Sequence, residues 1–239
     1  MNNISISDDY PLWNVKNVVY VFIVSQLAAV LIVYTLIKIL SLDTHSLFFS
    51  IVATITHLSS LVIFTIHDVS IKTKEVSKQL RLIKPNSFKV FYFVLIGFAL
   101  WLISLFIPES WSAEPYALTI IKQSTSSGIF VFSIIALKNI FVIPFFEEIF
   151  WRGYAYPAFA QKIGRLYAIL LISLFFTLYH LAGLWGAWSS ITTVYIISVI
   201  LTALRARTNS TIVGIIVHSA YNFFITILVA ISMFAKTTH

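Results

Sequence analysis

Residues 143–152 read IPFFEEIFWR and place two adjacent glutamates, Glu147 and Glu148, and an arginine, Arg152, inside one of the most apolar parts of the chain. A charged side chain at the centre of a lipid bilayer costs about 3 kcal/mol on insertion scales. Such a cluster persists in a membrane helix only where its members pair with one another or face a water-filled cavity. The stretch therefore indicates a functional site inside a membrane-spanning helix.

The composition of the whole chain indicates a membrane-embedded protein. Of its 239 residues 59% are hydrophobic and only 10% are charged, which leaves too few polar residues to cover a soluble domain. Several apolar runs approach or exceed the roughly 20 residues that cross the hydrocarbon core as a helix. The ten-residue alternation of a membrane β-barrel does not occur. We predict an all-α, polytopic bundle of about seven transmembrane helices (six to eight) in a single domain, residues 1–239.

The apolar runs and the basic residues together predict a topology. Spans are expected near 18–40, 46–67, 89–107, 128–149, 166–183, 187–204 and 211–233. Lys and Arg concentrate in the intervening loops 68–88, 150–165 and 205–210, and such an excess marks the cytoplasmic side. We therefore expect a multi-pass protein of the cell membrane, of bacterial type, with a cytoplasmic amino terminus and no cleavable signal peptide. The net charge of +7 follows from this topology and gives no indication of nucleic-acid binding.

Polar side chains within the spans occur as pairs one helical turn apart. Glu148 and Arg152 lie four residues apart, so they share a helical face and can form an ion pair. Glu147 points about 100° away around the same helix and can face a cavity. Two adjacent carboxylates in different surroundings need not share one protonation state, which is what acid–base chemistry requires. The alternative is an ion pair that only joins two helices.

Two further pairs occur in later spans. Phe176 and His180 are four residues apart in LFFTLYHLAG, and so are His218 and Asn222 in IVHSAYN. Taken alone, His180 fits a structural role. His218 and Asn222, taken alone, fit hydrogen bonding between helices as well as they fit a functional site. Together, Glu147, His180 and the pair of His218 and Asn222 can supply what a hydrolytic site needs: a base, a second group that holds water, and two hydrogen-bond donors for an oxyanion.

Several other intramembrane chemistries lack their residues. The chain contains no cysteine, no HExxH zinc motif and no GxSxG nucleophile elbow. Its aspartates, Asp8, Asp9, Asp43 and Asp68, cannot supply an intramembrane aspartyl dyad. A water molecule activated by glutamate is the nucleophile that remains.

At these positions the sequence resembles the CPBP family. This family comprises CAAX prenyl endopeptidases of the Ras-converting type and bacterial relatives (Abi proteins) described as bacteriocin-processing or self-immunity proteins. Its pattern EExxxR, FxxxH and HxxxN is matched by EEIFWR at 147–152, FTLYH at 176–180 and HSAYN at 218–222. The resemblance covers about 140–225, within a motif-bearing core of about 128–233.

The resemblance implies a glutamate-dependent intramembrane protease that needs no metal and no cofactor. It implies water activation by Glu147 and His180, oxyanion stabilisation by His218 and Asn222, and a supporting role for Glu148 and Arg152. From the residue types alone, a zinc site formed by Glu147, His180 and His218 remains an alternative.

Three functions are compatible with this sequence. The first is hydrolysis of a peptide bond in a peptide or membrane-protein substrate that enters from the cytoplasmic leaflet, as in bacterial peptide processing. In the second, the same site passes an acyl group to an amine, as in lipoprotein modification. The third is a non-enzymatic role in bacteriocin self-immunity or membrane scaffolding, with a partner membrane protein. The lipid bilayer surrounds the protein in each case.

The predicted spans place the motif residues at different depths. Glu147 falls near the inner end of its span, His218 about a third of the way in, and His180 towards the outer end. We expect Pro144 to break the fourth span and to carry the acidic pair deeper, since breaks at membrane depth are tolerated where they line a cavity.

Overall fold

A computed structural model describes residues 11–44, 46–107 and 116–236 of the chain. These residues form helices and no strand. Seven helical segments among them are long and apolar enough to cross a membrane. The predicted all-α, polytopic architecture of about seven spans is therefore confirmed, and the protein is a multi-pass membrane protein.

The helices follow one another along the chain with short connections. They are α1 (Val15–Leu40), α2 (Leu47–Ser70), α3 (Val76–Gln79), α4 (Ser87–Ser104), α5 (Tyr116–Ser126), α6 (Ile129–Leu137), η2 (Lys138–Val142), α7 (Ile143–Glu148), η3 (Ile149–Ala155), α8 (Tyr156–Ile163), α9 (Arg165–Leu184), α10 (Trp188–Thr208) and α11 (Thr211–Lys236). The segments η2 and η3 are π-helical turns.

Short polar side chains and one glycine fix the ends of several spans. Asn14 accepts hydrogen bonds from the first backbone N–H groups of α1, while Asn17 accepts one from the backbone of Asn14. Ser46 and Asn86 cap α2 and α4 in the same manner. These caps satisfy N–H groups that the helices leave without a partner. Gly164 takes a φ of +83° between α8 and α9, a conformation that favours glycine.

The fourth predicted span is wrong at its carboxyl end. It was expected to end at 149 and to be followed by a cytoplasmic loop, but the helical segment runs from Ile129 to Ile163. Arg152 is fully buried inside this segment, and Pro157 lies in the first turn of α8, where a missing N–H is tolerated. The predicted outer loop 108–127 also contains a helix, α5, while its residues 108–115 lie outside the described residues.

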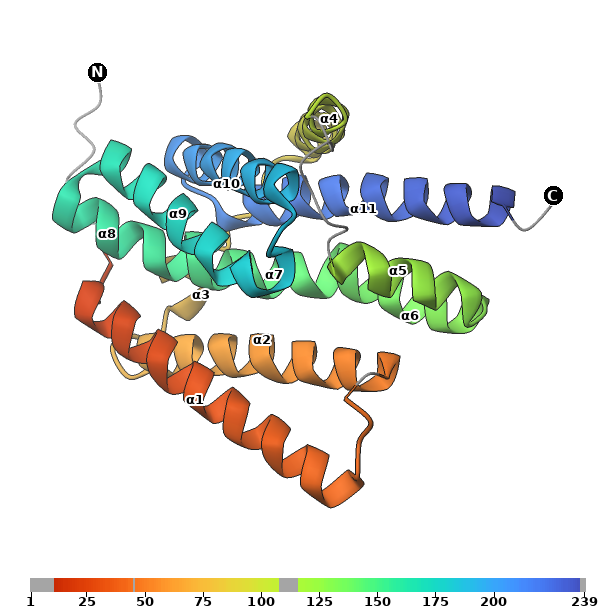
Figure 1. The fold of residues 1–239 in the computed structure, drawn as a ribbon. Helices are drawn as coiled ribbons and strands as arrows, with labels where there is room; N and C mark the ends of the chain where they lie inside the picture. Colours follow the sequence, from red (N-terminus) through yellow and green to blue (C-terminus); the bar gives the residue numbers. More distant parts are fainter. Residues whose placement is uncertain (1–10, 45, 108–115, 237–239) are drawn as a thin grey trace.

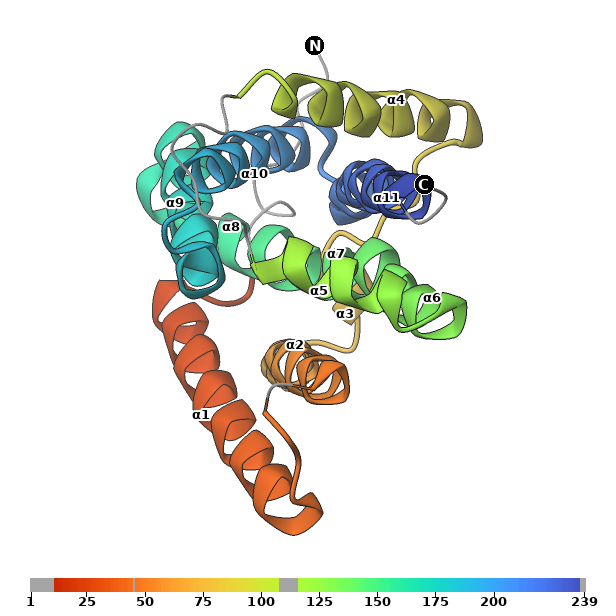
Figure 2. The ribbon, with the colours of Figure 1, turned by 45° about the vertical axis from the view of Figure 1, so that its right-hand side comes forward.

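The helical segment 129–163 is the central element of the fold. It runs through the middle of the molecule, with α1 and α2 on one side and α9, α10 and α11 on the other, as Figures 1 and 2 show. The helix α4 packs against α11, on the far side from α1 and α2. Every side chain of the acidic motif therefore starts from an element that is surrounded by other helices.

Hydrogen bonds tie the amino-terminal helices to this central segment. The hydroxyl of Tyr154 donates to the Oδ2 atom of Asp68 in α2 over 2.6 Å. The indole N–H of Trp13 donates to the Tyr154 carbonyl over 2.8 Å, and the two rings stack with centroids 4.8 Å apart. The hydroxyl of Thr211, at the start of α11, donates to the Leu80 carbonyl. These contacts join the central segment to α2 and to the residues before α1, and they join α11 to the end of α3.

Candidate active site

The acidic pair lies in the middle of the central segment. Glu147 is the nineteenth of the 35 residues from Ile129 to Ile163, so its expected place near the inner end of a span is corrected. Pro144 does not break the segment, because it lies in the first turn of α7 directly after the π-helical η2. Glu147 lies deeper than expected because the helical segment continues to Ile163 and does not end at 149.

Glu148, Arg152 and His218 form one buried cluster. The Nη1 atom of Arg152 lies 2.8 Å from Glu148 Oε1, so the ion pair expected from the four-residue spacing is present. His218 Nδ1 lies 3.0 Å from the same oxygen. A carboxylate only accepts hydrogen bonds, so Nδ1 of His218 carries the proton and donates it. The exposed fractions of the Glu148 and Arg152 side chains are both 0%.

Arg152 is held by hydroxyl groups of α10 that were not recognised in the sequence. Its Nη2 donates to Ser198 Oγ over 2.8 Å, and its Nε donates to Thr202 Oγ1 over 3.3 Å. The guanidinium also stacks over the ring of Phe176, 4.5 Å from the ring centroid. The available signal was that these two hydroxyl residues lie one turn apart within the largely apolar stretch 194–204.

Gly214 is a third residue that the motifs did not reveal. A Cβ atom at this position of α11 would lie 2.5 Å from Glu148 Oε2, well inside the van der Waals distance. The absence of a side chain therefore lets α11 approach the carboxylate closely enough for His218 to reach it. Only the packing of two helices distant in sequence creates this requirement.

Glu147 and His180 form the second pair. Glu147 Oε1 lies 3.4 Å from His180 Nε2. His180 Nδ1 lies 2.8 Å from the Phe176 carbonyl oxygen, which only accepts, so Nδ1 carries the proton and Nε2 is the atom that faces the carboxylate. The other oxygen of Glu147, Oε2, is buried and has no hydrogen-bond partner among the described residues. Glu148 Oε2 is buried without a partner among the described residues as well, and a bound water is one way in which such oxygens are satisfied.

Phe176 lies between the two pairs. Its ring centroid is 4.5 Å from that of His180 and 6.3 Å from that of His218. The structure thus brings the histidines of two different helices to one aromatic side chain, although span counting had placed them at different depths.

Asn222 follows His218 by one turn of α11 and bonds to the central segment. Its Nδ2 donates to the backbone carbonyl of Asn139 over 2.8 Å. This is a contact with η2 rather than with another motif residue. One of the two N–H groups of the Asn222 amide remains for a further acceptor.

The described residues contain no group of three His, Cys, Asp or Glu side chains arranged around a common metal position. His180 is paired with Glu147, and His218 with Glu148, as two separate contacts. In this geometry the three residues of the alternative zinc site do not converge as ligands.

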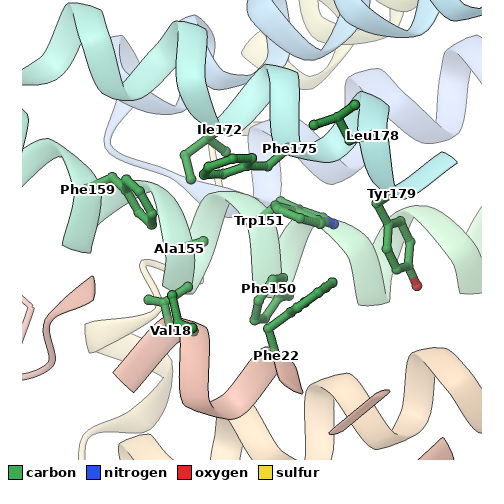
Figure 3. A pocket seen from close by; sticks show the side chains of 11 residues that line it. Val18, Phe22, Phe150, Trp151, Ala155, Phe159, Ile172, Phe175, Leu178 and Tyr179 are labelled. Carbon is green, nitrogen blue, oxygen red and sulfur yellow. The ribbon is translucent and has the colours of Figure 1, made fainter. Parts of the chain in front are cut away.

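An apolar cavity adjoins the site. It has a volume of about 390 Å³ and lies between α1, η3, α8 and α9, as Figure 3 shows. Trp151 and Tyr179 form the part of its lining nearest to the motif residues, since their rings lie 5.9 Å from Phe176 and 5.4 Å from His180 respectively. Glu147, His180, His218 and Asn222 do not line this cavity themselves, and an apolar group bound there would contact Trp151 and Tyr179.

The fold and these contacts define a class of protein. The molecule is a polytopic helical membrane protein with two glutamate–histidine contacts and an arginine buried at the centre of its bundle.

Comparison with known families agrees with this description. Residues 127–224, which hold all three motifs, match the family described as type II CAAX prenyl endopeptidase Rce1-like. The resemblance identified from the motifs is thereby confirmed. The family supports an intramembrane protease of the CAAX type. Comparisons with curated proteins and with solved structures found no match.

Proposed function

We propose that this protein is an intramembrane endopeptidase in which Glu147 and His180 activate a water molecule to hydrolyse a peptide bond. The observation that carries the proposal is the 3.4 Å approach of Glu147 Oε1 to His180 Nε2, halfway along the central segment. Such a pair has little structural value in a membrane interior, where charged groups are costly.

The protonation of His180 supports this role. With its Nδ1 proton donated to the Phe176 carbonyl, the neutral ring presents a lone pair at Nε2. A carboxylate and this lone pair are both acceptors, so one water molecule can donate one hydrogen to Glu147 and the other to His180. Its oxygen lone pairs are then left for attack on a carbonyl carbon.

The reaction is a general-base hydrolysis. Water oxygen bonds to the carbonyl carbon while one of its protons passes to Glu147, and the carbonyl oxygen becomes an oxyanion. Collapse of this tetrahedral intermediate breaks the C–N bond as the same proton passes to the leaving nitrogen. The products are a carboxylic acid and an amine, which become a carboxylate and an ammonium group by proton transfer between them, and no other reactant is needed.

His218 and Asn222 are proposed to stabilise the oxyanion. Because Nδ1 of His218 donates to Glu148, the ring can donate from Nε2 only as an imidazolium. The proposed role therefore requires a charged His218, whose Nδ1 lies 3.0 Å from Glu148 Oε1. Asn222 supplies its second amide N–H.

The proposed substrate is a peptide or membrane protein that reaches the site from the cytoplasmic leaflet of a bacterial cell membrane. The chain is proposed to have its amino terminus in the cytoplasm. In support, exposed basic side chains lie within the connection between α2 and α4 and at the helix ends that flank the α8–α9 and α10–α11 connections, namely Lys74, Lys78, Lys84, Lys162, Arg165 and Arg207. The cavity lined by Trp151 and Tyr179 would take an apolar group of the substrate.

A comparison of wild type with Glu147→Ala in native membranes tests the proposal. Peptide and lipoprotein products are profiled by mass spectrometry, with and without a metal chelator. We expect a chelator-resistant cleavage product that is lost in Glu147→Ala and in His218→Ala. Glu75→Ala is the control, since Glu75 lies in an exposed surface ion pair with Lys78.

Each other outcome has a definite meaning. A product whose mass shows acyl transfer to an amine would replace proteolysis by lipoprotein modification. Loss of the product on chelation alone would overturn the metal-independent mechanism. Identical profiles for all variants would support a non-enzymatic role in immunity or scaffolding.

A further inference from the structure

The π-helical turn before the acidic motif leaves one backbone carbonyl without its helical partner. In η2 the N–H of Ile143 donates to the carbonyl of Lys138, five residues earlier. In the same register, the N–H of residue 144 would donate to the carbonyl of Asn139. Residue 144 is proline, which has no N–H, so it cannot make this bond.

Asn222 donates to the carbonyl that Pro144 leaves free. Its Nδ2 lies 2.8 Å from the Asn139 oxygen, across 83 residues of sequence. A carbonyl at membrane depth is costly to leave without a hydrogen bond, and this part-buried carbonyl receives one from Asn222. The Asn139 carbonyl therefore links the two residues, because Pro144 cannot donate to it and Asn222 does.

We propose that Pro144 is a positioning residue for the oxyanion site, an inference that rests on the proposed function of Asn222. The free Asn139 carbonyl accepts one N–H of the Asn222 amide and so fixes which end of the amide is the nitrogen. Because the amide is planar, the second N–H then points in one direction only.

The orientation matters because a flipped amide would reverse the electrostatics. If a backbone N–H also bonded to the Asn139 carbonyl, the Asn222 amide would have to share that acceptor. Its own hydrogen bond would weaken, and the amide could turn by 180°. Its Oδ1 would then lie where a donor is needed and would repel the developing oxyanion. Pro144 thus acts through Asn222 on the transition state and leaves substrate binding unchanged.

Pro144→Ala tests the inference, because it restores an N–H that competes for the Asn139 carbonyl. Removing one oxyanion donor costs about 100- to 1000-fold in kcat, so we expect Asn222→Ala to lose about 100-fold. Pro144→Ala should lose at least about 10-fold in kcat with KM unchanged. The double variant should be no slower than Asn222→Ala alone.

Pro157→Ala is the matched control. Pro157 follows the other π-helical turn, η3, so this variant makes the same chemical change in the same segment without an Asn222 partner. We expect wild-type kcat for it. Wild-type kcat in Pro144→Ala, an equal loss in Pro157→Ala, or multiplied losses in the Pro144→Ala/Asn222→Ala double variant would each overturn the inference.

A measurement without turnover separates this inference from the proposed function. The side-chain amide of Asn222 is followed by NMR in ¹⁵N-asparagine-labelled protein in detergent, with assignment by its loss in Asn222→Ala. We expect its hydrogen exchange to be slow in wild type and at least about 10-fold faster in Pro144→Ala, as the hydrogen bond is lost. Unchanged exchange would overturn the inference even if Glu147-dependent cleavage were established. Faster exchange without any Glu147-dependent product would leave the coupling intact and refute the proposed function.

Discussion

Gly214→Ala is the most direct test of how the Glu148 cluster is built. The added Cβ would lie 2.5 Å from Glu148 Oε2, and ordinary contact begins near 3.4 Å, so the carboxylate must retreat by about 0.9 Å. Its side chain is fully buried, and Arg152 and His218 both bond to its other oxygen. The retreat therefore acts directly on those two hydrogen bonds.

The expected loss follows from those bonds. A hydrogen bond to a charged group contributes about 1.5–3 kcal/mol. Loss of one such bond, which holds His218 in place, lowers the rate by about 10- to 150-fold, at 1.36 kcal/mol for each factor of ten. Alanine favours the helix over glycine by about 1 kcal/mol. This gain offsets part of the lost stability but none of the lost rate, so we expect a small fall in the thermal midpoint beside a large fall in the rate.

The assay is the initial rate of the Glu147-dependent product in membranes, together with the thermal midpoint of the purified protein in detergent. Gly183→Ala is the control, because a Cβ at Gly183 would meet nothing within 4 Å while gaining the same helix propensity. A Gly214→Ala protein that works within about twofold of the control would show that Glu148 does not act through this contact.

Two further substitutions test how the surrounding helices are held. Gly97→Ala would place a Cβ 2.6 Å from that of Ala220, and overpacking of about 1–3 kcal/mol should lower the Tm by about 2–12 °C in a thermal melt. A Tm of Gly97→Ala equal to that of the Gly183→Ala control would contradict close packing of α4 on α11. Tyr154→Phe removes the donor to Asp68 and should lower the Tm by about 3–12 °C. The exposed Tyr20→Phe serves as its control, and equal melting of the two variants would mean that this bond does not hold α2 in place.

The apolar spans and the one-turn pairs could be predicted from the sequence because both follow from local rules. Hydrocarbon thickness sets the length of a span, and the helical repeat puts Glu148 and Arg152 on one face. Six of the seven predicted spans coincide with helices whose ends differ by at most four residues. The prediction of the fourth span failed at its carboxyl end because Arg152 and Pro157 are residue types typical of a loop. Burial of Arg152 among other helices allows the helical segment to continue there.

The sequence by itself determined the class of protein and the polar residues inside the membrane, because the cost of burying charge makes such residues conspicuous in an apolar chain. The tertiary structure decided the distant partners: Glu147 meets His180, and Glu148 meets His218 and the bare backbone of Gly214. These contacts join residues tens of positions apart, and they depend on how closely each helix approaches the central segment. Helix approach is set by side-chain packing over the whole bundle, which no local pattern encodes.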